Sequence, residues 1–341
     1  MSPKRSIIPV FVPHLGCPND CVFCNQRRIS GTLTPATKET VIQAVEDAER
    51  LNLTSNELEL AFYGGSFTAI PGEEQEELLS AAYEFIKKGR LNSIRLSTRP
   101  DCIDTETVER LKHFGVSTVE LGVQSMCPDV LSASNRGHTA EDAVKAAELI
   151  KNTGFTLILQ MMTGLPLDTR EKSVFTAREL SKLKPDGVRI YPTVIIKDTA
   201  LFDMWCDGMY QEHTVEEAAD WCSEIMDVFE SENIPVIRLG LNPTDELSGG
   251  AAAGGAYHPA FGELVAGKRY LKKADKLLDG KDCVQITFGV ARGEISKAVG
   301  QKRCNILLLT EKYGLKKVLV KETDIKKGEI VILSLSNDYR K

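Results

Sequence analysis

The sequence of 341 residues has no apolar run as long as the roughly 18 residues that a membrane-spanning helix needs. It also has no low-complexity tract and no repeat of the solenoid kind. The first stretch, "MSPKRSIIPVFVPHLG", is basic and then apolar, but Pro9 and Pro13 interrupt it and no small-residue cleavage site follows. We therefore interpret it as a first β-strand, and we expect a cytoplasmic protein with no membrane segment.

The overall composition excludes no further class of globular protein, because 42% apolar and 26% charged residues are ordinary values. The length allows one large domain and a small one.

Charge is unevenly distributed: residues 265–341 hold 18 Lys and Arg against 9 Asp and Glu, a balance of +9. The first 264 residues hold the other 24 against 39, a balance of −15. A basic C-terminal segment after an acidic body predicts two units with different partners.

The nine cysteines are not expected to form a disulfide framework in a cytoplasmic protein. Six of them are isolated, and we expect them to be small buried hydrophobic residues: Cys102, Cys127, Cys206, Cys222, Cys283 and Cys304. The other three crowd into "CPNDCVFC" as Cys17-x3-Cys21-x2-Cys24, among polar and turn-forming neighbours. That clustering favours a shared chemical role.

Short β-rich runs alternate with longer helical patterns, in which apolar residues recur at three- and four-residue steps. Glycine follows several of these patterns, at Gly89, Gly115 and Gly154. Repeated strand–helix units predict a parallel sheet, here a partial (β/α)6 TIM-like barrel. The six runs span residues 6–12, 58–63, 93–97, 118–123, 155–162 and 187–191, and a weaker seventh spans 234–240.

The alternating pattern breaks after residue 240. We expect a barrel over residues 1–240 and a glycine-rich loop or linker over 241–263. Beyond it, "CVQITFGV", "KKVLV" and "EIVILSL" look like strands, with a helix near 303–313. Residues 264–341 are therefore predicted to form a small basic α+β domain.

Three cysteines at this spacing suit two kinds of metal site. Zinc would require a fourth ligand, such as His14 or a distant Cys or His. A 4Fe-4S cluster held by three thiolates keeps one iron open for a substrate or cofactor. The segment follows the first strand, at the barrel face where such folds place their chemistry.

Cys-x3-Cys-x2-Cys after the first strand resembles the signature of the radical S-adenosylmethionine (SAM) superfamily. The resemblance implies a 4Fe-4S cluster on Cys17, Cys21 and Cys24, which would be the catalytic centre, with Phe23 near the adenine of SAM. In that family SAM chelates the open iron through its amine and carboxylate. Reductive cleavage of SAM then gives a 5′-deoxyadenosyl radical that abstracts hydrogen. A flavodoxin or ferredoxin type of electron donor would then be a partner.

The same resemblance implies SAM contacts where the later strands end. The glycines of "YGGSF" allow close approach of the backbone to the ligand. Arg136, in "NRGHT", would bind the carboxylate of SAM through two parallel hydrogen bonds. The alternative interpretation of Arg136 is a surface arginine in a helix cap. The residues expected at SAM are Phe23, Gly64, Gly65, Ser97, Arg99, Gln124, Arg136, Gln160, Met161 and Met162.

A narrower resemblance, over about residues 7–270, is to the radical SAM part of the Elongator catalytic subunit and its short bacterial relatives. It is carried by "STRPD", "ELGVQS", "NRGHT", "MMTGLP", "IYPT" and "YHPAFGELV". The compact cysteine spacing departs from that subunit, and no counterpart of its acetyltransferase domain is found. Gln160 stands where the more distantly similar oxygen-independent coproporphyrinogen oxidase has a ribose-binding aspartate.

Three hypotheses about function remain open. The first is an enzyme that modifies RNA, with tRNA as a possible partner; Lys268, Arg269, Lys272 and Lys273 would be the RNA contacts nearest the barrel in sequence. Few aromatic residues for base stacking occur in the basic segment. The second is an enzyme acting on a small metabolite such as a tetrapyrrole. The third is a non-catalytic protein that binds the cluster or SAM.

Overall fold

The structure is a computed structural model that describes residues 5–12, 17, 20–24, 35–51, 57–242 and 247–337. His14, considered above as a zinc ligand, lies outside the described residues. Contacts divide the chain into two compact units. The first comprises residues 1–213 and 225–256, and the second comprises 214–224 and 257–341.

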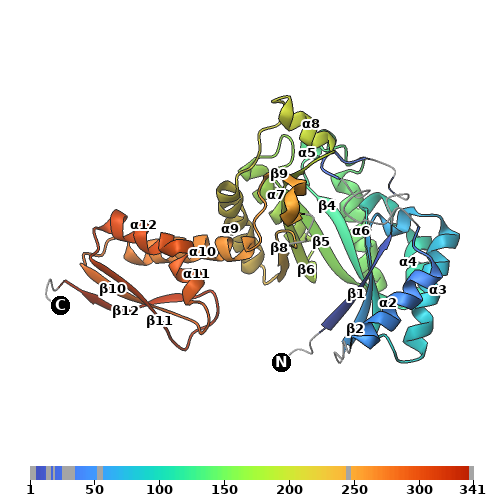
Figure 1. Cartoon of the computed structure of the whole chain (residues 1–341), viewed down its shortest axis with the longest axis horizontal. Coiled ribbons are helices and arrows are strands. Elements are labelled where there is room, and N and C mark those ends of the chain that lie inside the picture. The colour runs from blue at the N-terminus through green and yellow to red at the C-terminus, as the bar shows by residue number, and fades with distance from the viewer. Residues whose placement is uncertain are drawn as a thin grey trace. The chain divides into compact units, whose positions relative to one another are not determined.

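The first unit is built on a sheet of seven parallel strands whose spatial order follows the sequence (Figure 1). This confirms the predicted α/β partial barrel, and the weak run near residue 236 supplies its seventh strand. β1 and β8 are the edges. The strands are β1 (Arg5–Val12), β2 (Glu57–Gly64), β3 (Ser93–Thr98), β4 (Val116–Gln124), β5 (Thr156–Thr163), β6 (Gly187–Pro192) and β8 (Val236–Leu239).

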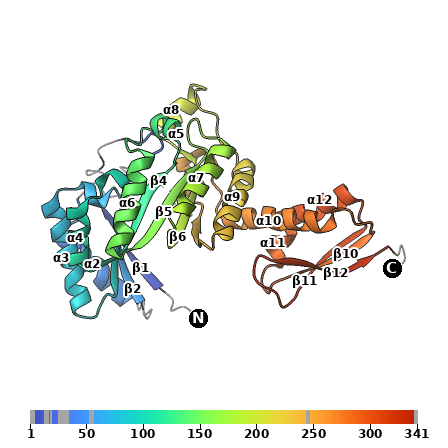
Figure 2. The same cartoon turned by 180° about the vertical axis from the view of Figure 1, so that it is seen from behind.

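Helices connect successive strands and cover one face of the sheet; α6 and α7 lie over β4, β5 and β6 in Figure 2. A two-stranded antiparallel ribbon of β7 (Val194–Ile196) and β9 (Ala252–Gly255) completes the unit, so part of the glycine-rich segment is a strand. The helices are α2 (Lys38–Arg50), α3 (Gly72–Lys87), α4 (Thr105–His113), α5 (Pro128–Ala133), α6 (Ala140–Thr153), α7 (Arg170–Lys182), α8 (Ala200–Cys206) and α9 (Val215–Ser231).

Local sequence signals set the helix ends. α6 begins with a capping box, in which the Thr139 side chain accepts from the Asp142 backbone and Asp142 accepts from the Thr139 backbone. It ends at Gly154, whose φ of 91° lies in the left-handed region that glycine adopts without a steric penalty. The predicted stop at this glycine is therefore confirmed.

The two faces of the sheet differ in character because side chains alternate along each strand. On β5, Leu157, Leu159 and Met161 are fully buried, in the apolar layer that packs on the helices. Gln160 and Met162 are half-buried and belong to the opposite face. That opposite face is the interior of the partial barrel, and it carries most of the polar side chains discussed below.

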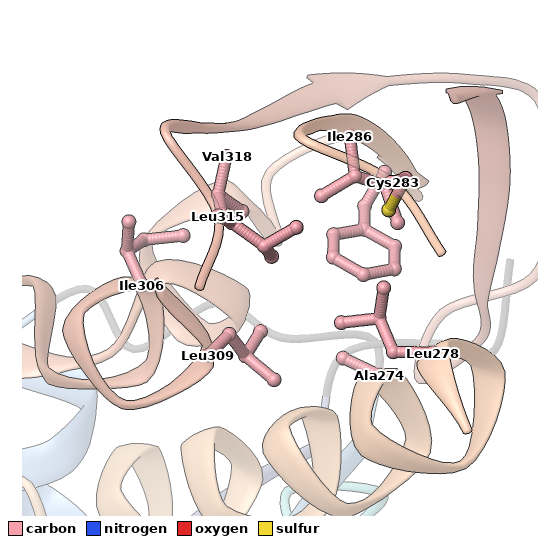
Figure 3. Packing of buried hydrophobic residues seen from close by; sticks show 9 residues of the cluster. Ala274, Leu278, Cys283, Ile286, Ile306, Leu309, Leu315 and Val318 are labelled. Carbon is pink, nitrogen blue, oxygen red and sulfur yellow. The ribbon is translucent and has the colours of Figure 1, made fainter. Parts of the chain in front are cut away.

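The second unit packs α10, α11 and α12 against a small mixed sheet with strand order β11-β10-β12. Its core contains Leu278 from α10, Ile286 from β10 and Leu309 from α12, which point toward one another in Figure 3. Among the described residues, no helix is both long and apolar enough to cross a membrane. The elements are α10 (Phe261–Leu278), β10 (Gln285–Val290), α11 (Ile295–Val299), α12 (Cys304–Tyr313), β11 (Lys317–Glu322) and β12 (Ile330–Ser336).

Candidate active site

The clustered cysteines lie beyond the end of β1, in the first unit. Cys21 is buried, whereas Cys17 and Cys24 are half-buried, and none of the three forms a disulfide with a described residue. A tight turn links two of them, because the Cys24 amide donates to the Cys21 carbonyl at 2.9 Å. In the part of the chain that the structure describes, no three His, Cys, Asp or Glu side chains converge closely enough to hold a metal ion.

Two other elements hold the cysteine segment in place. The Asn135 amide group donates to the Asp20 carbonyl at 2.8 Å, and the Val22 amide donates to the Ser134 carbonyl at 3.2 Å. On the other side, the Leu201 amide at the start of α8 donates to the Val22 carbonyl at 2.8 Å. The segment is therefore fastened to the loop between α5 and α6 and to α8.

Arg136 is the charged residue that the structure brings to the cysteines. Its Nη1 lies 3.2 Å from Cys21 Sγ, and its Nη2 donates to the Gly122 carbonyl at the end of β4. Arg99 donates to the Arg136 carbonyl and grips Asp101 through two bonds of 2.9 and 2.8 Å. Both guanidinium groups are buried, so Arg99 fixes the backbone that carries Arg136.

These cations favour the thiolate form that a cluster requires. Burial raises the pKa of the Cys17 thiol, while the Ser66 backbone amide and then Arg99 and Arg136 act to lower it. Ser66 and Arg99 are themselves linked, because the Arg99 amide donates to Ser66 Oγ at 3.1 Å. The groups that surround the cysteines are thus positively charged, and hydrogen bonds hold them in place.

Next to Arg136, residues at the ends of β3 and β4 carry buried polar atoms that lack partners in the described part of the chain. A Cβ on Gly122 would lie 3.1 Å from Gln124 Nε2 and 3.4 Å from Arg136 Nη2, so the missing side chain opens a cradle there. Arg99 Nη1 and Gln124 Oε1 are buried without a hydrogen-bond partner among the described residues. Such orphaned atoms indicate a polar ligand that supplies the missing bonds.

The other residues expected at SAM lie at different strand ends and on different faces of the sheet. Gly64, with a φ of 101°, and Gly65 end β2, and the Gly65 amide donates to the Val12 carbonyl at 2.8 Å. Ser97 is half-buried near the end of β3. Phe23 and Met162 both pack on the cluster of Cys127, Val130 and Leu165. Met161 lies on the helix-facing side of β5, away from Met162.

Sequence reasoning missed a charged network on the interior face of the barrel. Its centre is Glu120 on β4, which is fully buried. The Glu120 carboxylate accepts from side chains of the flanking strands β2, β3, β5 and β6 at 2.9–3.0 Å, namely Tyr63, Arg95, Gln160 and Arg189. Arg95 continues the network to Glu59, at 2.7 Å. A lone charge inside each apolar run, as in "LELAFY" and "TVELGV", was the signal available in the sequence.

The four basic residues proposed for RNA lie on α10, in the second unit. Lys268 pairs with Glu216 and Asp220 of α9 at 2.9 and 3.3 Å. Lys272 donates to Ser223 at 2.6 Å and lies 3.5 Å from Glu224, and Lys273 donates to the Gly328 carbonyl at 2.8 Å. The three ammonium groups therefore already have partners within their own unit, which includes residues 215–224 of α9.

Comparisons with known proteins agree with this geometry. The family model "Radical SAM superfamily" matches residues 11–180, and the model "Radical_SAM C-terminal domain" matches residues 185–273. A parallel sheet with polar groups gathered where its strands end is the architecture of such enzymes. The chain belongs to the radical SAM superfamily and is a radical SAM enzyme.

Among curated proteins, the chain is 29% identical over 196 residues to the tRNA uridine(34) acetyltransferase of Methanocaldococcus jannaschii. It is 30% identical over 203 residues to Elongator complex protein 3 of Schizosaccharomyces pombe. These matches cover 52% and 53% of this chain but only 36% and 37% of the relatives. The archaeal Elp3 structure of Methanocaldococcus infernus has a similar fold, with a TM-score of 0.63 at 22% identity, over 81% of this chain and 64% of that one.

The superfamily uses a 4Fe-4S cluster and SAM, and the residues present fit both. Cys21 Sγ lies 3.2 Å from the buried Arg136. Burial raises the pKa of Cys17, but Arg99 and Arg136 act to lower it, which suits an anionic cluster. The cradle at Gly122 and the orphaned atoms of Arg99 and Gln124 suit the polar groups of SAM. The individual ligand and contact assignments stay predictions.

We expect Glu120→Gln to destabilise the first unit by about 3–5 kcal/mol, because Arg95 and Arg189 would be left buried without their shared carboxylate. Urea unfolding followed through Trp205, in a Trp221→Phe background, measures this. The exposed pair of Glu84 and Lys87 supplies the control: Glu84→Gln should change stability by less than about 0.5 kcal/mol. Equal effects of the two substitutions would contradict the role of Glu120.

His138 should make stability depend on pH. Burial first, and then Arg136, lower its pKa from 6.5 to about 4, and its Nε2 lies 3.1 Å from the Val123 carbonyl. Between these values the unfolded chain binds more protons, so stability falls as the pH drops from 6.5 through 4. Relative to His138→Gln, the wild type should lose roughly 2 kcal/mol between pH 6.5 and 4.5. Parallel stability curves for the two proteins would refute the assignment.

Proposed function

We propose that this radical SAM enzyme modifies RNA, and that its substrate is a tRNA. The observation that carries the proposal is the similarity to proteins named tRNA uridine(34) acetyltransferase and Elongator complex protein 3, over about half of this chain. The chain spans little more than a third of those relatives, so the proposal takes up the radical chemistry and leaves acetyl transfer aside.

When bound, the cluster and SAM supply a 5′-deoxyadenosyl radical that can remove hydrogen from an unactivated C–H bond. In our proposal Cys17, Cys21 and Cys24 hold the cluster. Arg136 neutralises charge at Cys21 and reaches the carboxylate of SAM, and Arg99 holds the Arg136 backbone in register. This assignment gives Arg99 a positioning role in addition to the contact expected from the sequence.

The other contacts follow from the geometry around Gly122. Gln124 would bind the ribose through its orphaned Oε1, and Ser97 would lie next to it. Gly64 and Gly65 would admit the methionine amino group along the backbone of β2. Phe23 and Met162, which share one apolar cluster, would line the adenine. Gln160, which is bonded to Glu120, and Met161, which faces the helices, would not touch the adenine directly. Reduction of the cluster would need an external donor of the flavodoxin or ferredoxin type.

The test of this function is anaerobic reconstitution with iron, sulfide and SAM, followed by incubation with a reductant and with tRNA transcribed without modifications. We expect about four iron per chain, formation of 5′-deoxyadenosine, and a new nucleoside mass in digested tRNA. Ala replacing Cys17, Cys21 or Cys24 should abolish all three. Cys222→Ala, at a buried cysteine elsewhere in the fold, is the matched control and should retain them. Deoxyadenosine without any change in the tRNA, and with turnover of a cell metabolite extract, would favour the small-molecule hypothesis.

Arg136→Ala should weaken SAM binding at least tenfold, which corresponds to about 1.4 kcal/mol. The physical reason is the loss of the guanidinium that would pair with the carboxylate of SAM. Equilibrium binding to the reconstituted protein gives the affinity, and the iron content should stay at the wild-type level. Arg110→Ala, which removes a half-buried arginine of α4 that pairs with Glu106, is the control. Unchanged affinity in Arg136→Ala would show that this assignment is wrong.

A further inference from the structure

A short basic loop in the second unit sits in an arrangement that the proposed function does not use. β10 leads into α11, the loop Gly300–Arg303 follows, and α12 leads into β11. β10 and β11 are parallel neighbours in the sheet, so the helix pair forms the crossover between them. The unit thus contains a strand–helix–loop–helix–strand motif whose central loop reads Gly-Gln-Lys-Arg.

This loop has a fixed conformation. Gly300 has a φ of 78°, and a Cβ there would lie 2.6 Å from Cys304 Sγ, so only glycine fits. Lys302 and Arg303 follow with φ of 50° and 63°, in the left-handed region. The buried Asn305 fastens the start of α12 by donating to the carbonyls of Gly267 on α10 and Ala298 on α11, at 2.8 and 3.0 Å.

The loop presents charge that the protein does not neutralise. Lys302 and Arg303 are exposed, and their side chains make no hydrogen bond or ion pair with any described residue. Lys268 and Lys272, by contrast, face acidic residues of α9. In a segment of net charge +9, this loop presents two adjacent exposed cations on a fixed backbone; Lys326 and Lys327 are another adjacent exposed pair.

The surroundings of the loop suit a polymer with apolar parts as well as charge. Leu307 and Leu308 lie one turn into α12 and are 62% and 50% exposed. A cavity of about 250 Å³ adjoins the loop; Gly300, Gln301, Cys304 and Asn305 line it together with residues of α10 and the start of α9, including Glu216, Glu263 and Lys268. Phosphates beside the cations and bases over the leucines would use both kinds of surface, whereas an apolar protein partner would leave the cations unpaired.

We propose that the Gly300–Arg303 loop, with α11 and α12, is a clamp for the backbone of single-stranded RNA, of the kind found in KH modules. Those modules hold the nucleotide backbone on a Gly-x-x-Gly loop between two helices. Here the fourth position is Arg303, which keeps the left-handed conformation of a glycine and adds a second charge. The inference shares with the proposed function the expectation of an RNA substrate, but it assigns the binding to Lys302 and Arg303.

The test is binding of a fluorescent 12-nucleotide single-stranded RNA to the full chain at several salt concentrations. The Lys302→Asp/Arg303→Asp variant should bind at least tenfold more weakly. Its slope of log affinity against log salt should fall by about 1.4, for two phosphate contacts at roughly 0.7 each. The matched control is Lys326→Asp/Lys327→Asp, which makes the same change of charge at an exposed turn and should bind within threefold of wild type.

Equal weakening in both double variants would reduce the effect to net charge and overturn the clamp, as would binding of the duplex form at the same or higher affinity. Arg303→Gly is a second variant that removes the charge and keeps the fold, because glycine adopts a φ of 63° without strain. It should keep the wild-type melting temperature and still bind at least threefold more weakly. Deoxyadenosine formation without RNA should be unchanged in all variants. Loop variants that bind RNA normally contradict the clamp alone, whereas wild type that binds RNA but never modifies it contradicts the proposed function alone.

Discussion

The carboxylate of Glu120 is the interaction on which the catalytic unit depends. It is fully buried and accepts from side chains of β2, β3, β5 and β6, so one anion joins five consecutive strands across the interior of the barrel. The helix-facing layer of the same strands is apolar and needs no directional bonds. Because a buried charge is costly unless its partners are in place, this network favours one register of the sheet. The strand ends that carry Gly64, Thr98 and Gln124 are held in the same register.

Much of this organisation could be predicted from sequence. Alternating apolar runs and helical periodicity gave the strand–helix units, and Gly154 marks a helix end because its left-handed φ suits that residue. Motifs placed at strand ends converge because parallel strands end at one edge of the sheet. The contacts of Arg99 with Asp101 and with the Arg136 carbonyl could not be predicted, since they depend on the path of two loops. The ion pairs of Lys268 with Glu216 and Asp220 of α9 could not be predicted either, since they depend on how α10 packs against α9.

The second unit illustrates how net charge and available charge differ. Its sequence balance of +9 is spread over many lysines, yet Lys268, Lys272 and Lys273 of α10 are paired or hydrogen-bonded within the unit. Availability depends on geometry: Lys302 and Arg303 stand on a strained turn between two helices, where Asn305 and Gly300 fix the backbone and leave the side chains in solvent. A count of basic residues indicates that a polyanion is attracted, and the loop indicates where it would be held.

The hydrogen bonds that fasten the cysteine segment have a consequence for assembly of the site. Ser134 and Asn135 hold residues 20–22 through the backbone, and the next residue along, Arg136, reaches the sulfur of Cys21. The short loop of residues 134–136 therefore fixes both the backbone position of the cysteine segment and the contact of the Arg136 guanidinium with Cys21 Sγ. A change in the length or sequence of this loop would disturb the anchoring of the cysteine segment and the placement of the cation at Cys21 at the same time.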